Sequence, residues 1–146
     1  MHSLDQILHK RMLVSATPDE NVLAVARRMV SSDVGAVVVV AAGNVAGIFG
    51  GAFLFPRLVV ALPQPPPTTV GEVMTREVVT AQLHDRTGTC EEKMRRAACR
   101  HLPVLAGGRV IAMLSMRDLL QDDLEEQVAE NQLLRAYIYQ TPLVRP

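Results

Sequence analysis

The sequence is poor in aromatic residues and has no excess of charge of either sign. Among its 146 residues there is no Trp, and aromatic side chains make up 3% of the total. Apolar residues nevertheless amount to 49%, so a hydrophobic core must be built from Val, Leu, Ala and Met. Lys and Arg together number 15, as do Asp and Glu. Because nucleic-acid binding relies on excess positive charge that meets phosphates, this balance predicts no nucleic-acid partner.

Residue patterns typical of metal sites and of catalysis are also scarce. The two cysteines, Cys90 and Cys99, form no Cys-x-x-Cys pair, and the four histidines are scattered without ligand spacing. We therefore expect two buried thiols in a reducing compartment rather than a zinc site or a disulfide. The only conceivable nucleophile–base couple is one of these thiols with His101, and there is no Walker-type phosphate loop. The sequence thus predicts no catalytic residue, no metal site and no enzyme activity.

The N-terminal segment, MHSLDQILHKR, mixes charged and apolar side chains. A secretory signal peptide needs an uninterrupted apolar stretch of about 7–15 residues, and this segment has none. We therefore expect a cytoplasmic protein.

One long stretch of the sequence, from Val34 to Pro56, carries no charged side chain. About 20 apolar residues suffice to cross a bilayer, and this stretch is long enough. In addition, Gly43, Gly47 and Gly51 have the four-residue spacing of a transmembrane dimer interface. The rest of the chain argues against a membrane span, because it contains a second copy of this stretch.

The chain repeats itself, and VVVVAAGNVAGIFG (37–50) aligns with LPVLAGGRVIAMLS (102–115) without a gap. Such self-similarity indicates two copies of one supersecondary unit. The second copy has Gly107, Gly108 and Arg109 at its centre, which is typical of two strands joined by a tight turn. By correspondence, we predict strands at AVVVVA (36–41) and VAGIF (45–49), and no membrane association.

Each half is predicted to contain the same elements in the same order. A short helix (4–9; 70–74) precedes a short strand (13–15; 78–80) and an amphipathic helix (19–32; 89–99), and two strands and a closing helix follow. Asp19 or Asn21 is the expected cap of the first amphipathic helix, and Thr89 with Glu92 forms a predicted capping box in the second. The predicted organisation is a first unit (1–62), a Pro-rich linker (63–68), a second unit (69–122), and a C-terminal amphipathic helix with a tail (123–146).

Three segments of the sequence resemble the cystathionine-β-synthase (CBS) domain, present as a tandem pair. They are TVGEVMTREVVTA (69–81), RHLPVL (100–105) and VIAMLSMRDLL (110–120), and the resemblance extends over residues 3–122. It implies an α/β (α+β) fold of two β-α-β-β-α units packed about a pseudo-twofold axis. It also implies a cleft between the units of the kind that commonly binds adenosine-containing ligands.

The resemblance places a ligand site at SMRD, residues 115–118, where a strand meets a helix. It implies that Asp118 accepts hydrogen bonds from both ribose hydroxyls and that Ser115 faces a phosphate, with Arg117 adding positive charge. A carboxylate suits two adjacent hydroxyls, and a helix N-terminus suits a phosphate. Ser-x-x-Asp is also a helix-capping pattern that needs no ligand, and the motif alone leaves both interpretations open.

Further site residues follow from the same resemblance. It implies that Thr80 and Ala81 contact the base and that Leu102 and Pro103 pack against the face of the adenine. It also implies that Arg100 and His101 contact phosphates. The alternative for the first pair is an ordinary strand end, and for the last pair an exposed loop.

Two departures from the family pattern affect the predicted site. Gly50 and Phe53 occupy the positions that match Ser115 and Asp118, and a Phe cannot accept hydrogen bonds from ribose. We therefore expect the site of the first half to be lost or changed. Ala112 stands where the family prefers Gly, and its methyl group is expected to narrow the approach to the second site.

Residues 119–140 predict a long amphipathic helix with an apolar stripe, formed by Leu120, Leu124, Val128, Leu134 and Ile138. We expect this stripe to bind a second copy of the chain in a homodimer. The alternative is that the helix packs back on its own chain.

The sequence therefore predicts a regulatory module. It is expected to bind AMP, ADP, ATP or NAD in the cleft, as an energy-sensing protein would, and to modulate an unknown separate protein, with no cofactor required. The alternative is a scaffold that has lost its nucleotide site and acts only in protein–protein assembly.

Overall fold

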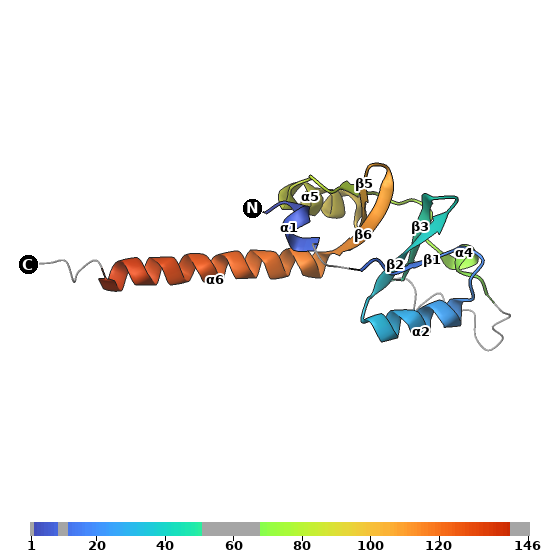
Figure 1. Ribbon diagram of the computed structural model, residues 1–146, viewed down its shortest axis with the longest axis horizontal. Helices are drawn as coiled ribbons and strands as arrows, with labels where there is room; N and C mark the ends of the chain where they lie inside the picture. The colour runs from blue at the N-terminus through green and yellow to red at the C-terminus, as the bar shows by residue number, and fades with distance from the viewer. Residues whose placement is uncertain (1, 9–11, 51–67, 141–146) are drawn as a thin grey trace, which may run out of the picture.

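Figure 1 shows the computed structural model, in which two small mixed units lie side by side and one long helix extends away from them. The structure describes residues 2–8, 12–50 and 68–140, so most of the predicted linker (63–67) lies outside it. The first repeat contains α1 (Leu4–Leu8), β1 (Ser15–Ala16), α2 (Val22–Ser32), β2 (Ala36–Ala41) and β3 (Asn44–Gly50). The second contains α4 (Val70–Val73), β4 (Ala81–Gln82), α5 (Thr87–Ala97), β5 (His101–Ala106), β6 (Arg109–Ser115) and α6 (Met116–Gln140). The predicted mixed α/β fold is confirmed.

The uncharged stretch forms strands β2 and β3, as predicted, and its last residues (51–56) lie outside the described part of the chain. The two strands pair antiparallel along their length. Positive φ angles of 51° at Ala42 and 80° at Gly43 reverse the chain between them, and Gly107 and Gly108 make the same turn between β5 and β6. Among the described helices, none combines the length and the apolar character that a membrane crossing needs.

Each repeat forms one three-stranded sheet, with strand orders β1-β2-β3 and β4-β5-β6. The first strand of each sheet is parallel to the second, and the register is the same in both repeats: Ala16 lies opposite Val39, and Ala81 lies opposite Val104. The predicted positions of these short strands (13–15 and 78–80) were too early in the sequence. The apolar pattern begins before the residues that pair with the neighbouring strand, so it does not mark where pairing starts.

The short helices α1 and α4 are exchanged between the two units. Leu4 and Leu8 of α1 are buried in the core of the second repeat, together with Leu102 and Leu114. In the same way, α4 contributes Val70 to the core of the first repeat. Figure 1 shows α1 among the elements of the second unit and α4 among those of the first. Neither core is therefore built from one repeat alone.

Backbone hydrogen bonds hold the exchanged segments in equivalent positions. In the first unit, the Val70 N–H donates to the Glu20 carbonyl at 2.9 Å. In the second, the Leu4 N–H donates to the Asp85 carbonyl at 3.3 Å. Glu20 and Asp85 occupy matching positions in the aligned repeats, so the exchange follows the symmetry of the duplication.

Helix caps differ between the two amphipathic helices. Asn21 caps α2 as predicted, and its side chain accepts from the N–H groups of Leu23 and Ala24. The predicted Thr89–Glu92 capping box is wrong, because α5 already begins at Thr87. There the Thr87 N–H donates to the carbonyl of His2 in the exchanged segment, as the Val22 N–H donates to the Thr68 carbonyl at the start of α2.

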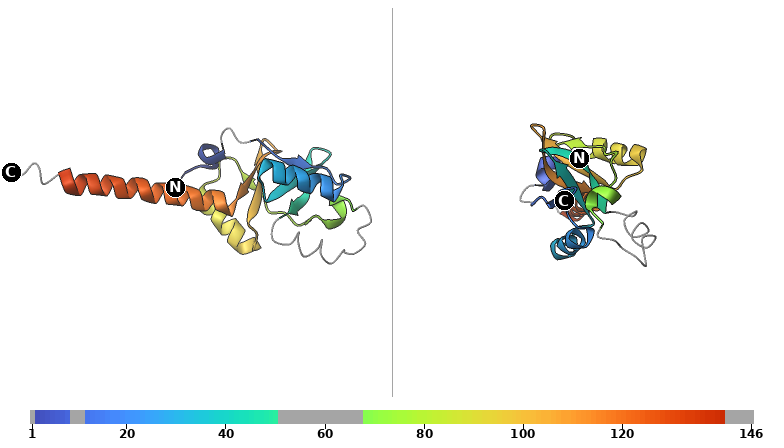
Figure 2. Two further views of the ribbon diagram at one scale, coloured as in Figure 1. Left: turned by 90° about the horizontal axis from the view of Figure 1, so that it is seen from below. Right: turned by 90° about the vertical axis from the view of Figure 1, so that its right-hand side faces the viewer.

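Helix α6 has 25 residues and runs well beyond the body of the molecule (Figures 1 and 2). Leu119 is buried against the second unit, whereas the predicted stripe is exposed. Leu120, Leu124, Val128, Leu134 and Ile138 are between 48% and 61% exposed. The predicted helix is thus confirmed. Its stripe does not pack against the described part of its own chain, and the homodimer stays a prediction.

Candidate ligand-binding site at the start of helix α6

Ser115 and Asp118 form a reciprocal capping box where β6 ends and α6 begins. The Ser115 N–H donates to Asp118 Oδ2 at 2.8 Å, and the Asp118 N–H donates to Ser115 Oγ at 3.1 Å. The Met116 N–H donates to the Arg100 carbonyl at 2.8 Å, which holds the helix start against the start of β5. The capping interpretation of Ser-x-x-Asp is therefore confirmed, and the same bonds fix the carboxylate at the helix N-terminus.

His101 lies beside this box, on the side of the first repeat. It is the cross-strand partner of Ser115. Its Nε2 is 3.8 Å from the position that a Cβ on Gly35 would take, so the imidazole reaches the first unit. Burial lowers the pKa of His101, the negative charge of Asp118 opposes this, and Arg100 lowers the pKa further. The ring is therefore neutral near pH 7.

The alternation of strand β5 separates the predicted site residues onto two faces. Leu102 is fully buried in the core of the second repeat, on the face that packs against the helices. His101, Pro103 and Ser115 lie on the opposite face, because neighbouring strand residues point to opposite sides. Leu102 is therefore not brought together with His101 and Ser115, whereas Pro103 shares their face.

Ala112 belongs to the same buried core as Leu102, with 4% of its surface exposed. Its methyl group therefore points away from the face of His101 and Ser115. The expectation that it narrows the approach to the site is wrong, because strand alternation directs it to the other side of the sheet.

Ala81 is buried and the Thr80 carbonyl has a structural partner, whereas the predicted contact of the Thr80 hydroxyl with a base stays a prediction. Ala81 was predicted to end its strand, but it is the first residue of β4. Its side chain is fully buried there. The Thr80 carbonyl accepts from Lys93 Nζ at 3.0 Å, and Lys93 also pairs with Asp85 at 3.1 Å. Burial raises the pKa of Asp85, but hydrogen bonds from the Gln82 amide and from Lys93 outweigh it, and the pKa lies below its ordinary value.

The same polar arrangement recurs in the first repeat and was missed in the sequence. Arg28 donates to the Ser15 carbonyl at 2.7 Å and pairs with Glu20. Its hydrogen bonds hold the pKa of Glu20 below the usual range. The signal was present, because the aligned repeats match Arg28 with Lys93, both basic, and Glu20 with Asp85, both acidic.

Arg100 and Arg117 are both exposed, and they stand on either side of the helix start in the sequence. The N–H groups of the first helical turn and these two guanidinium groups give this end of α6 a positive character. The Asp118 carboxylate balances part of this positive charge.

The matching position in the first repeat cannot carry a serine in the present backbone. Gly50 has a φ of 121°, and a Cβ on it would lie 2.6 Å from the Gly35 carbonyl oxygen. Phe53 lies outside the described residues. The two halves thus differ at the strand end itself, which supports one site rather than two.

Two surface hollows lie elsewhere on the second unit. One is lined by residues of α5, and the other, of about 370 Å³, lies between the exchanged N-terminal segment and the β5–β6 turn. Neither includes Ser115 or Asp118. The candidate site is accordingly a polar helix start beside the seam of the two units.

The profile of the CBS domain matches residues 5–50 and 70–125, which are the two repeats. The chain belongs to the CBS domain family. A CBS domain-containing mitochondrial protein of Arabidopsis thaliana, CBSX3, is 30% identical over 127 residues, and the match covers 84% of this chain and 62% of the plant protein. This chain therefore spans less than two thirds of that relative.

Solved CBS structures have the same fold. A protein with CBS domains from Burkholderia ambifaria superposes with a TM-score of 0.78 at 28% identity, covering 86% of this chain and 96% of its own. The CBS domain pair of the protein MJ0100, solved in complex with 5′-methylthioadenosine and S-adenosyl-L-methionine, superposes with a TM-score of 0.72 at 20% identity. That match covers 82% of this chain and 98% of the other. The tandem CBS pair expected from the sequence is thus confirmed.

Proposed function

We propose that this CBS pair is a regulatory module that binds an adenosine-containing nucleotide at the start of α6 and modulates a separate protein. The observation that carries the proposal is the Ser115–Asp118 box, which lies beside His101 at the seam between the units. The complex of the MJ0100 pair with two adenosine compounds supports this ligand class.

The chemistry of the box suits a nucleoside with a charged group. A carboxylate offers about four acceptor positions, so Asp118 can accept from sugar hydroxyls while it keeps its bond from the Ser115 N–H. The helix N-terminus, Arg100 and Arg117 provide donors and positive charge for a phosphate or a comparable group. His101, which is neutral, contributes a hydrogen bond rather than a charge. Pro103 lies on the same face of the strand and is buried there.

The position of the site suggests how occupancy is transmitted. Helix α6 begins at the site and carries its exposed apolar stripe far outside the body (Figure 1). A ligand held at the first turn of this helix would bias its direction. We propose that this direction sets how two copies of the chain, or the chain and its regulated partner, assemble along the stripe.

A thermal-shift panel of AMP, ADP, ATP, NAD and S-adenosylmethionine tests the proposal. A ligand at a hundredfold excess over its Kd stabilises the fold by about 2.7 kcal/mol. Asp118→Asn removes the charge but retains an oxygen for the Ser115 N–H, and we expect it to abolish the shift. Glu72→Gln is the matched control, because Glu72 accepts from the Thr69 N–H in the capping box of α4. No shift with any ligand, or a shift that persists in Asp118→Asn, would contradict the proposal.

The second candidate is an assembly scaffold without a nucleotide, and Gly50 supports it, because the first repeat has no serine at the position that matches Ser115. On this alternative, Asp118→Asn leaves both the nucleotide panel and the oligomeric state as in the wild type. A preference for AMP over ATP in the panel would instead indicate energy sensing.

A further inference from the structure

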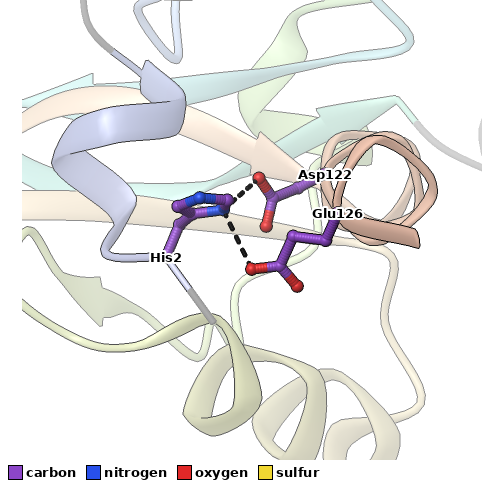
Figure 3. Close-up of side chains that lie close together, drawn as sticks. All are labelled: His2, Asp122 and Glu126. Carbon is purple, nitrogen blue, oxygen red and sulfur yellow. Dashed lines mark hydrogen bonds and ion pairs between the residues drawn. The ribbon is translucent and has the colours of Figure 1, made fainter. Parts of the chain in front are cut away.

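A histidine and two acids from distant parts of the sequence converge where the N-terminal segment crosses α6. Figure 3 shows the side chains of His2, Asp122 and Glu126 pointing toward one another. One potential ligand atom from each of the three residues lies within 4.8 Å of the other two. Asp122 and Glu126 are one helical turn apart and share one face of the helix. His2 lies 120 residues before Asp122 in the sequence, so no local spacing indicates the cluster.

The hydrogen bonds within this cluster leave one buried oxygen without a partner. His2 Nδ1 lies 2.7 Å from Asp122 Oδ1 and 3.3 Å from Glu126 Oε1. Asp122 is 8% exposed, and within the described residues its Oδ2 has no hydrogen-bond partner. The imidazole nitrogen that contacts Asp122 Oδ1 thus leaves Asp122 Oδ2 unsatisfied among the described residues.

We propose that His2, Asp122 and Glu126 bind a divalent transition-metal ion of the Zn²⁺ type. Imidazole nitrogen and carboxylate oxygen are both ligands that zinc accepts, and three protein ligands with one water complete a tetrahedral site. At bond lengths of about 2.0–2.2 Å, two ligand atoms of such a site lie roughly 3.4 Å apart. The 3.3 Å between His2 Nδ1 and Glu126 Oε1 already fits this spacing.

The shorter of the two His2 contacts has to change when the ion binds. The 2.7 Å between His2 Nδ1 and Asp122 Oδ1 is a hydrogen-bond distance, and it lengthens as the ion replaces the imidazole proton. The ion then supplies the partner that the buried carboxylate lacks. It also fastens the exchanged N-terminal segment to α6, one helical turn beyond Asp118.

Calorimetric titration of the full chain with ZnCl₂ tests the site. The protein should carry no tag at its N-terminus, because additional histidines there would compete for the ion. We expect one equivalent to bind, and we expect His2→Ala and Glu126→Gln each to weaken binding at least about tenfold, the scale on which even indirect ligand contacts affect metal sites. Circular dichroism checks that both variants fold.

Matched controls separate this site from surface binding. Glu125→Gln alters an exposed acid next to Glu126 on the same helix, and His84→Ala removes an exposed imidazole on the same unit. Cys99→Ala removes the half-buried free thiol. All three should bind zinc as the wild type does, and so should Asp118→Asn, which keeps the test independent of the proposed nucleotide site. Absence of saturable binding, undiminished binding in His2→Ala and Glu126→Gln, or loss in Cys99→Ala would overturn the proposal.

Discussion

At the scale of single residues, Gly47 and Gly50 of the first repeat show why the two repeats are not interchangeable. A Cβ on Gly47 would lie 2.6 Å from the Thr75 carbonyl oxygen, because the segment after α4 pairs with β3 at that point. The matching residue of the second repeat, Ala112, carries its methyl group in the core. Gly47 thus leaves room for the neighbouring backbone in the first repeat, whereas Ala112 fills space in the core of the second.

Gly50→Ser, which restores the residue type of the second repeat, is expected to destabilise the protein. The new Cβ would meet the Gly35 carbonyl at 2.6 Å, and the φ of 121° is strained for any side chain. Strain of this kind costs about 1–3 kcal/mol. Urea unfolding would measure it.

Gly35→Ala is the control for this measurement, because the nearest atom to its Cβ is His101 Nε2 at 3.8 Å. We expect its free energy of unfolding to stay near that of the wild type. Equal stability of Gly50→Ser and Gly35→Ala would contradict the explanation.

At the scale of elements, the acid–base pairs between the amphipathic helices and the first strands stand out. Lys93 on α5 reaches both the Thr80 carbonyl and Asp85, and Arg28 on α2 does the same with Ser15 and Glu20. Each pair ties a helix to the chain that enters the sheet. The two-residue strands β1 and β4 are therefore held by these side-chain interactions as well as by their backbone hydrogen bonds to the neighbouring strand.

The pH dependence of stability should depend on these pairs. The folded-state pKa of Asp85 lies below the ordinary value of about 4. Its stabilising contribution is therefore complete above that value and is lost as the pH falls through the lower folded-state pKa. We expect urea unfolding at pH 7 and pH 3 to show a smaller acid-induced loss in Asp85→Asn than in the wild type. An exposed acid on the same unit, changed in Glu125→Gln, provides the control, and an identical loss in both variants would rule out the pair as the cause.

The sequence predicted those elements whose signal is local and repeated. The hairpins followed from the Val-rich run and from Gly107 and Gly108, and α6 followed from its apolar spacing. The start of α5 at Thr87 matches the start of α2 at Val22 in the aligned repeats, but the local Thr-x-x-Glu pattern at 89–92 pointed to a later start. In the site, the Ser115–Asp118 box is local, whereas the proximity of His101 to Gly35 depends on how the two sheets meet.

At the scale of the whole molecule, the exchange of α1 and α4 makes each unit depend on the other repeat for its core. Leu4 is fully buried, yet the core that it fills belongs to the second repeat. The two units thus cannot be stable independently of each other.

Leu4→Ala is expected to cost about 2–5 kcal/mol, as for other buried leucines. Hydrogen exchange should report the damage first in α5 and β5 rather than in β2, although Leu4 is closer to β2 in the sequence. Leu23→Ala, at a 59% exposed position of α2, is the control and should leave both units protected. Faster exchange confined to the first repeat in Leu4→Ala would show that α1 packs on its own half.

The proposed homodimer depends on the exposed stripe of α6. Leu124→Glu places a charge within the stripe, where Leu124 is 56% exposed, and should convert the dimer into a monomer in light scattering with little loss of monomer stability. Leu133→Glu changes a 72% exposed leucine outside the predicted stripe and should leave the mass unchanged. A wild-type chain that is monomeric at high concentration would contradict the proposed homodimer.

The crossing of α1 and α4 also bears on how such a chain could have arisen. A single copy of this unit would lack the helix that completes its core. It would obtain that helix only by exchanging its own short helix with a second, identical molecule. Two such copies would have folded as an intertwined pair of separate molecules. Duplication with a connecting segment then converts a concentration-dependent association into one that every newly made polypeptide carries within itself.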